Sequence, residues 1–228
     1  MSDDILSPVP RHRVRALTSA AREYGRQLFQ DDAALAFWRD RGLTDDTIRD
    51  AGLGYARVPV AGHEKYRGML SIPYWVHGGV VTIRWRRLGD GWGGPKYLSM
   101  PDEPARLYGT DVLSDPAAVE VFACEGEGDR LVLSQLGLAA VAFPGAQTLK
   151  PWMRTALRDR QVFIVTDPDA AGDQLAEQLS GLGPRVHLPG DVTETFQAGG
   201  KGAILEALAE ALMVQEAHID DYLTGGDD

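Results

Sequence analysis

Acidic side chains follow three of the four strands predicted in the C-terminal half of the chain, and their placement suits the binding of divalent cations. These acids come after the first, third and fourth strands: Glu125, Asp167, Asp169 and Asp191. Residues that directly follow the strands of an open parallel sheet meet at one edge of that sheet. Carboxylates gathered there repel one another unless cations lie between them, and an all-oxygen set favours magnesium or manganese over zinc. The sequence therefore predicts a magnesium site.

The spacing within this set supports the same prediction. Asp167 and Asp169 are two positions apart in an extended segment, so their side chains leave the same side of the backbone. Gly172 allows the helix that follows to approach the sheet closely. Each acid alone has an ordinary explanation, because D-x-D pairs occur in surface turns and Glu125 and Asp129 could simply begin a helix. Their combined order along the chain favours the metal site.

The elements that position these acids alternate between strand and helix from about residue 119 onward. Short apolar runs separated by helices predict a Rossmann-like, four-stranded parallel sheet with right-handed crossovers. The strands are expected at 119–124, 139–143, 161–166 and 185–188. With a further helix over 202–214 they form a subdomain that spans 113–214, and the acidic residues 215–228 are expected to form a flexible tail.

Residues 1–112 predict a second, mixed α/β subdomain, so the fold class is α/β with two subdomains. Three short helices are expected between His12 and Gly52, with Thr44 as the N-cap of the third. A β-hairpin follows over 67–88, and the Gly- and Pro-rich stretch after it is expected to be a long functional loop.

The second strand of this hairpin has two different faces. Side chains alternate along a strand, which places Val81, Ile83 and Trp85 on the core face. The opposite face carries Arg84 and Arg86 and is expected to contact polyanions, although an ordinary solvated strand face is the alternative.

Composition sets the class of protein. The 228 residues are 44% hydrophobic and 25% charged, which is typical of globular proteins. No apolar stretch is long enough for a membrane span or a secretory signal, so we expect a cytoplasmic protein without a membrane partner. A single cysteine, Cys124, excludes a cysteine-based zinc site within this chain.

Charge is distributed unevenly. Residues 1–110 carry 16 Lys and Arg against 13 Asp and Glu, a net of +3, while residues 111–228 carry 7 against 20, a net of −13. This asymmetry is typical of a protein that holds a polyanion with one half and concentrates carboxylates in the other, although surface charge can also drift between domains.

Several spaced motifs resemble a known family. EGEGD and the later DPDAAG resemble the two elements of the Toprim signature, which DnaG-type primases, topoisomerases and certain nucleases share. The N-terminal half is similar to DnaG-type primases in particular, through RGLTDDTIRDAGLGYA, RGMLSIPYWVHGGVVTIRWRRL and PKYLSMPDEPARLYG. The resemblance covers about residues 15 to 200, most of the chain.

The resemblance implies the RNA polymerase core of a primase, which synthesises RNA primers on single-stranded DNA from ribonucleoside triphosphates with Mg²⁺ or Mn²⁺. Implied catalytic residues are Glu125, Asp129, Asp167 and Asp169, and implied metal ligands are Glu125, Asp167, Asp169 and Asp191. Arg67, Arg86 and Lys96 fall on basic positions of the family, and with Arg84 they are expected to bind nucleic acid or nucleotide.

The sequence also departs from the family. Thr193 stands where a second acid follows the position of Asp191. Zinc-binding and helicase-binding domains are not found in this chain. We therefore expect either a separate zinc-binding primase module and a replicative helicase as partners, or a chain that is a shortened piece of a longer protein. If the gene belongs to a bacteriophage, the protein acts in the host cytoplasm.

Two other functions remain open. A Toprim-type nuclease would use the same metals to hydrolyse phosphodiesters, and a non-catalytic adaptor would only bind DNA or a replication partner. Nucleotide incorporation that depends on the acids would separate both from a primase.

Overall fold

The computed structural model describes residues 9–89, 93–143 and 149–224, with side chains as far as residue 213. The chain forms two units, Met1–Asp115 and Pro116–Asp228. Within the described ranges, no helix is both long and apolar enough to cross a membrane.

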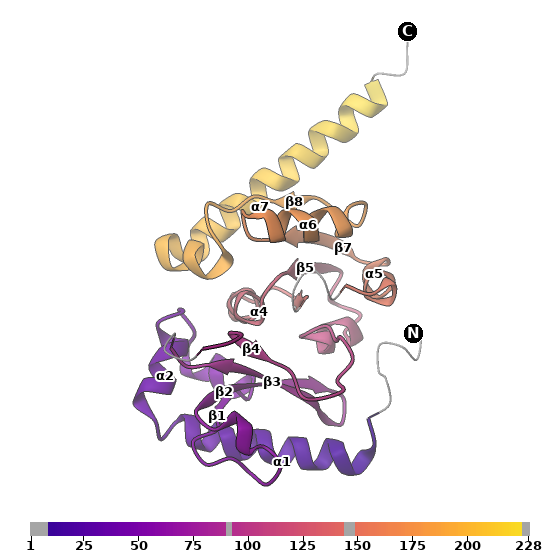
Figure 1. Cartoon of the computed structure of the whole chain (residues 1–228). Helices are drawn as coiled ribbons and strands as arrows, with labels where there is room; N and C mark the ends of the chain where they lie inside the picture. The colour runs from indigo at the N-terminus through magenta and orange to yellow at the C-terminus, as the bar shows by residue number, and fades with distance from the viewer. Residues whose placement is uncertain (1–8, 90–92, 144–148, 225–228) are drawn as a thin grey trace. The chain divides into compact units, whose positions relative to one another are not determined.

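The first unit is built on an antiparallel sheet in the order β1-β2-β3-β4 (Figure 1). Its helices are α1 (Arg11–Leu28), α2 (Asp32–Arg39) and α3 (Asp45–Asp50), with short 3-10 helices at Glu64–Tyr66 and Thr110–Ser114. Its strands are β1 (Gly54–Tyr55), β2 (Met69–Val76), β3 (Gly79–Arg87) and β4 (Tyr97–Leu98).

Helix α1 packs on this sheet because its apolar side chains recur every three or four residues. Its buried stripe faces β1 and β3 and includes Leu17, Ala20, Ala21, Tyr24 and Leu28. Trp85 of β3 is fully buried beneath it and stacks on Tyr66, with the two ring centroids 4.2 Å apart. The core-facing position predicted for Trp85 is confirmed.

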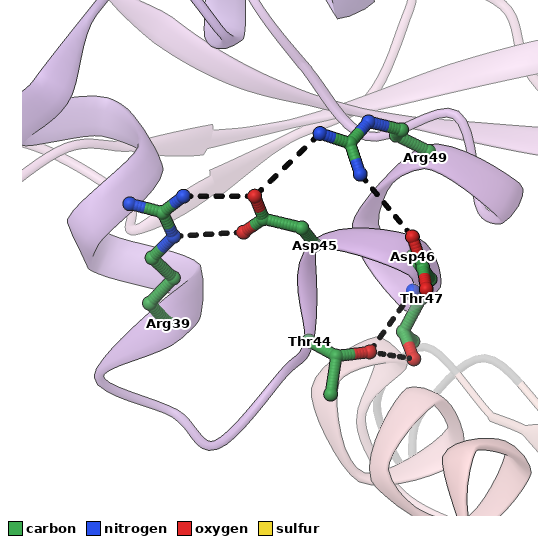
Figure 2. Close-up of polar contacts among 6 residues, drawn as sticks. All are labelled: Arg39, Thr44, Asp45, Asp46, Thr47 and Arg49. Carbon is green, nitrogen blue, oxygen red and sulfur yellow. Dashed lines mark hydrogen bonds and ion pairs between the residues drawn. The ribbon is translucent and has the colours of Figure 1, made fainter.

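Helix α3 begins at the predicted cap. The Thr44 hydroxyl accepts a hydrogen bond from the Thr47 backbone N–H at 3.2 Å. Arg39 at the end of α2 makes a bidentate ion pair with Asp45, both N–O distances being 2.8 Å, and Arg49 also contacts Asp45 (Figure 2). These contacts join α2 and α3.

The opposite face of β3 is less exposed than strand alternation predicts. Arg86 is only 5% exposed, because the Phe37 ring of α2 lies 4.1 Å from its guanidinium carbon and the Tyr97 hydroxyl accepts from its Nε at 3.1 Å. Tyr97 belongs to β4, a short strand inside the predicted loop, whose residues 90–92 lie outside the described part.

The second unit confirms the predicted parallel sheet, in the order β6-β5-β7-β8. Its strands are β5 (Glu120–Cys124), β6 (Ala140–Ala142), β7 (Gln161–Val165) and β8 (Arg185–Val186). The helices are α4 (Glu127–Gln135), α5 (Pro151–Leu157), α6 (Ala170–Leu179) and α7 (Val192–Thr224).

Helix α7 differs from the prediction for this region. Its first residue is Val192, and non-helical backbone at Gly200, where φ is +61°, divides it into two helical segments, of which the second contains the predicted helix 202–214. It then continues to Thr224, so residues 215–224 are helical where composition predicts a flexible tail, and the C-terminal part of α7 extends away from its sheet (Figure 1). Residues 215–224 contain neither proline nor glycine, the two residues that disfavour a helix most.

Candidate active site

The parallel register places two of the predicted acids at one edge of the sheet. Strands β5 and β7 are neighbours, and Cys124 pairs with Val165. Glu125 follows the first of these strands directly and Asp167 lies two residues beyond the second. Both acids therefore lie past the carboxyl ends of adjacent strands, as the spacing predicts.

Asp169 and Asp191 cap two helices at the same edge. One oxygen of Asp169 accepts from the backbone N–H groups of Ala171 and Gly172, at 2.9 and 2.8 Å. One oxygen of Asp191 accepts from the N–H of Glu194 at 2.7 Å. Each carboxylate is thereby fixed through one oxygen, which also sets the orientation of its other oxygen. The sequence contains a signal for both of these caps, because aspartate is a common N-cap residue directly before a helix.

Asp129 lies in the first turn of α4 and is held by the start of α7. The Thr193 hydroxyl donates to its Oδ1 at 3.2 Å. A Cβ on Gly126 would lie 2.8 Å from Asp129 Oδ2, so glycine at that position leaves room for the carboxylate. Thr193, at the position where the family resemblance led us to expect an acid, instead positions an acid that is already present.

Asp167 is positioned by contacts that sequence reasoning missed in part. A Cβ on Gly172 would lie only 2.0 Å from the Asp167 carbonyl oxygen, so α6 approaches the sheet closely, as predicted. The same carbonyl accepts from Arg185 Nη2 at 3.1 Å, while Arg185 Nη1 pairs with Asp173 at 2.6 Å. Arg185 begins β8, and its sequence neighbourhood carries no signal for this role.

The pKa values show that these carboxylates share one electrostatic environment. Burial, followed by the charges of Asp167 and Asp191, raises the pKa of Asp129 to about 7. Burial, followed by the charges of Asp191, Asp169 and Glu194, raises the pKa of Asp167 to about 6. The pKa of Glu125 is raised by burial and then by Asp167 and Asp169. The structure therefore brings the predicted acids together.

The donor set at this edge fits a hard divalent cation. It consists of carboxylate oxygens, and Glu125 Oε2 is buried without a hydrogen-bond partner. Among the described residues, no three His, Cys, Asp or Glu side chains stand in a geometry that already surrounds an ion. An ion would therefore require rotation of these side chains, while their backbone positions already bring them to one edge.

Asp129→Asn is expected to stabilise the metal-free protein at high pH. Because the pKa of Asp129 is about 7 in the folded protein against an ordinary 3.8, the folded state binds this proton more tightly than the unfolded chain. Stability contributed by the protonated form is present below pH of about 4 and is lost as the pH rises through about 7. With allowance for screening by water, the variant should gain about 2 kcal/mol over the wild type at pH 8 and little at pH 4.

Urea unfolding in EDTA at both pH values measures this difference. Asp159→Asn, at an exposed position of the same unit, is the control and should show no such gap. A wild type more stable than Asp129→Asn at pH 8 would contradict the repulsion of the Asp129 carboxylate by Asp167 and Asp191.

The basic residues predicted to bind nucleic acid do not form a single site in the first unit. Arg86 and Lys96 line a pocket of about 430 Å³ together with Phe37, Arg41 and Arg87. The Arg41 guanidinium carbon lies 3.6 Å from the Phe37 ring centroid, so two arginines lie on this ring, Arg41 from the turn after α2 and Arg86 from β3. Sequence reasoning missed Phe37, Arg41 and Arg87 in this pocket.

Arg84 and Arg67 do not line this pocket. The Arg84 guanidinium carbon lies 4.7 Å from the Tyr97 ring centroid. Arg67 is exposed, and its Nη1 donates to the Arg57 carbonyl at 3.2 Å. The predicted basic set is therefore brought together only at Arg86 and Lys96.

Comparison with known proteins identifies the class of fold. The Aquifex aeolicus primase, solved with its zinc-binding and RNA polymerase domains, superposes with a TM-score of 0.74 at 20% identity, over 90% of this chain and 63% of its own length. A DnaG primase catalytic domain bound to single-stranded DNA matches with a TM-score of 0.67 at 21% identity, over 89% of this chain and 83% of its own. The chain has the fold of a DnaG primase catalytic core.

No family model matches the chain. The gene 57 protein of Mycobacterium phage D29 is 36% identical over 154 residues, which are 63% of this chain and 99% of the phage protein. The chain belongs to the same family as this phage protein.

Proposed function

We propose that the chain is the catalytic core of a DNA primase, which joins ribonucleotides into short RNA primers on a single-stranded DNA template. The 3′-oxygen of one nucleotide would attack the α-phosphorus of the next, and pyrophosphate would leave. The observation that carries this proposal is the set of mutually repelling carboxylates at the sheet edge of a DnaG-core fold.

The acids would have different tasks in this reaction. Glu125, Asp167, Asp169 and Asp191 would hold Mg²⁺ directly or through water, with Asp129 in support. Mg²⁺, when bound, supplies charge stabilisation at the phosphates and a lower pKa for the attacking hydroxyl. Asp169 and Asp191 are already oriented by their helix caps, and Glu125 is the alternative candidate for a general base.

Template and nucleotide would be held by the first unit. Phosphate oxygens fit the cationic pocket that contains Arg41, Arg86 and Lys96, because guanidinium and ammonium groups bind phosphate by charge-assisted hydrogen bonds. Arg67 and Arg84 would contact the strand outside this pocket. One structural neighbour, the DnaG primase catalytic domain, was solved bound to single-stranded DNA, which supports the same kind of template here.

We also propose two protein partners and a cellular location for this chain. The Aquifex structure pairs the RNA polymerase domain with a zinc-binding domain, which supports a separate zinc-binding module as a partner for this chain. A replicative helicase is the second proposed partner, and a phage relative supports action in the cytoplasm of a bacterial host.

Primer synthesis on mixed-sequence single-stranded DNA tests the proposal. The chain is incubated with the four ribonucleoside triphosphates and Mg²⁺ or Mn²⁺, with and without candidate zinc-module proteins, and labelled products are separated on a denaturing gel. Short RNA products that disappear with EDTA are expected. Metal-dependent cleavage of labelled DNA without RNA products would indicate the nuclease instead, and DNA binding without either product would indicate the adaptor.

A further inference from the structure

A cavity of about 890 Å³ lies in the first unit, away from the cationic pocket described above. The C-terminal half of α1, the end of α3 and Trp75 of β2 surround it. Partly buried Phe29 and Trp75 line its apolar part together with buried Leu53. This volume lies in the range of specific ligand sites, which are largely apolar with a few polar groups at defined positions.

Arginine side chains surround the apolar part. Arg22, Arg26 and Arg49 all line the cavity and all are exposed, whereas Asp50 is the acidic residue among its lining. The chain as a whole carries a net charge of −10. Arg26 is paired with Glu23, and Arg49 is paired with Asp45 and Asp46, whereas Arg22 makes no ion pair with any residue that the structure describes. Arg22 is therefore the rim arginine best placed to pair with a carboxylate of a ligand.

The walls of the cavity are held in place before any ligand arrives. Arg49 lies over Phe29, with its guanidinium carbon 4.4 Å from the ring centroid, and contacts Asp45 and Asp46 at 3.5 and 3.2 Å (Figure 2). The Trp75 indole N–H donates to the Ala51 carbonyl at 3.0 Å. Pre-organised walls lower the entropic cost of binding.

These contacts favour a peptide over a nucleic acid. Base stacking needs a free aromatic face, but Arg49 covers a face of Phe29, and the Trp75 ring edge lies against Gly52, where a Cβ would be 3.0 Å from the ring. Carboxylates also lie beside the rim arginines, with Glu23 paired to Arg26 and the acids of α3 paired to Arg49. This alternation would repel a long run of phosphates but accommodates single carboxylates.

We propose that this cavity is a docking site for an acidic peptide segment of a partner protein. One or two apolar side chains of the peptide would enter between Phe29, Leu53 and Trp75. Carboxylates that flank them would contact Arg22 and Arg26 at the rim. The cavity shares no lining residue with the cationic pocket and includes none of the acids at the sheet edge, so this inference does not rest on the proposed catalytic function.

Filling the cavity tests its apolar part. Gly25 lines the cavity from α1, and a Cβ there would meet only the Leu53 carbonyl at 3.6 Å, an ordinary contact distance. Gly25→Met should therefore fold, since most residues favour a helix more than glycine does, and its side chain should occupy the cavity. Gly25→Ala is the matched control that keeps the cavity open.

Reversing a charge tests the rim. Arg22→Glu changes an arginine that lines the cavity, and Arg15→Glu makes the same change at an exposed position earlier on the same helix. The probe is a phage-displayed library of random dodecapeptides selected on the full chain. Enriched peptides are then synthesised with a fluorescein label, and binding is measured by fluorescence anisotropy.

We expect enriched peptides in which acids flank an aromatic or aliphatic residue. Their affinity should fall at least about tenfold with Gly25→Met and with Arg22→Glu, and stay within about twofold with Gly25→Ala and Arg15→Glu. Thermal unfolding of every variant confirms that it is folded, and primer synthesis by Gly25→Met should match the wild type.

Three results would overturn the proposal. One is a selection that yields no binder sensitive to Gly25→Met. Another is enrichment of basic peptides. The third is binding of oligothymidine that both Gly25→Met and Arg22→Glu abolish, together with no binding of acidic peptides. In that case the cavity would be a nucleic-acid binding site.

Discussion

Asp167→Ala is expected to reduce primer synthesis at least about a thousandfold while the affinity for single-stranded DNA stays within about twofold. Asp167 is central to the cluster, since its charge contributes to the raised pKa values of both Glu125 and Asp129. In the proposed function Asp167 holds Mg²⁺, so its removal would take away an oxygen ligand of the ion. A loss of about 4 kcal/mol in transition-state stabilisation corresponds to this factor.

The control for this experiment is Asp159→Ala, because Asp159 is an exposed acid of the same unit. Synthesis is measured as ribonucleotide incorporation at saturating Mg²⁺, and DNA binding is measured by fluorescence anisotropy. Equal synthesis by Asp167→Ala and the wild type would remove the sheet-edge acids from the reaction. Equal loss of DNA binding and synthesis would instead indicate a folding defect, which circular dichroism detects.

Gly172→Ala is expected to destabilise the second unit strongly. The added methyl group would lie 2.0 Å from the Asp167 carbonyl oxygen and 2.9 Å from two further backbone atoms of Asp167. Backbone atoms cannot move aside as a flexible side chain can, so α6 must shift away from the sheet. Overpacking of this kind costs about 3 kcal/mol or more, a fall in Tm of more than about 10 °C for a unit of this size.

This shift would also displace the capped carboxylate of Asp169, so synthesis should fall with stability. The matched control is Gly202→Ala in α7, where a Cβ meets no atom within 4 Å and alanine should stabilise the helix by up to about 1 kcal/mol. Calorimetry of both variants provides the comparison. A Tm for Gly172→Ala within about 2 °C of the wild type would contradict the close approach of α6 to the sheet.

The parallel sheet and its acids could be predicted because both depend on local signals. Apolar runs mark the strands, and the acids that follow three of the four strands are brought to the same edge by the topology alone. The gathering of Glu125, Asp167 and Asp191 at one edge therefore follows from order along the chain. The contact of Thr193 with Asp129 does not, because it depends on how the start of α7 meets α4.

The environment of the basic residues could not be predicted from strand alternation. The alternation places Arg86 on the face away from Trp85, but the ring that covers its guanidinium comes from Phe37, nearly fifty residues earlier. Periodicity identifies which face a residue occupies and contains no information on what packs against that face. The extension of α7 is not predicted for a different reason. The acidic composition of the last residues suggests a flexible tail, although Gly202 is the only proline or glycine between Lys201 and Thr224.

The two aspartate caps also affect whether the protein can fold before it binds a metal ion. Helices α6 and α7 both begin at the acidic edge, and the positive end of each helix dipole is directed toward an aspartate. Part of the repulsion between the acids is thereby offset by the backbone itself. We therefore expect the apoprotein to reach its native topology unaided and to take up metal afterwards, unlike small zinc domains that remain unstructured until they are loaded.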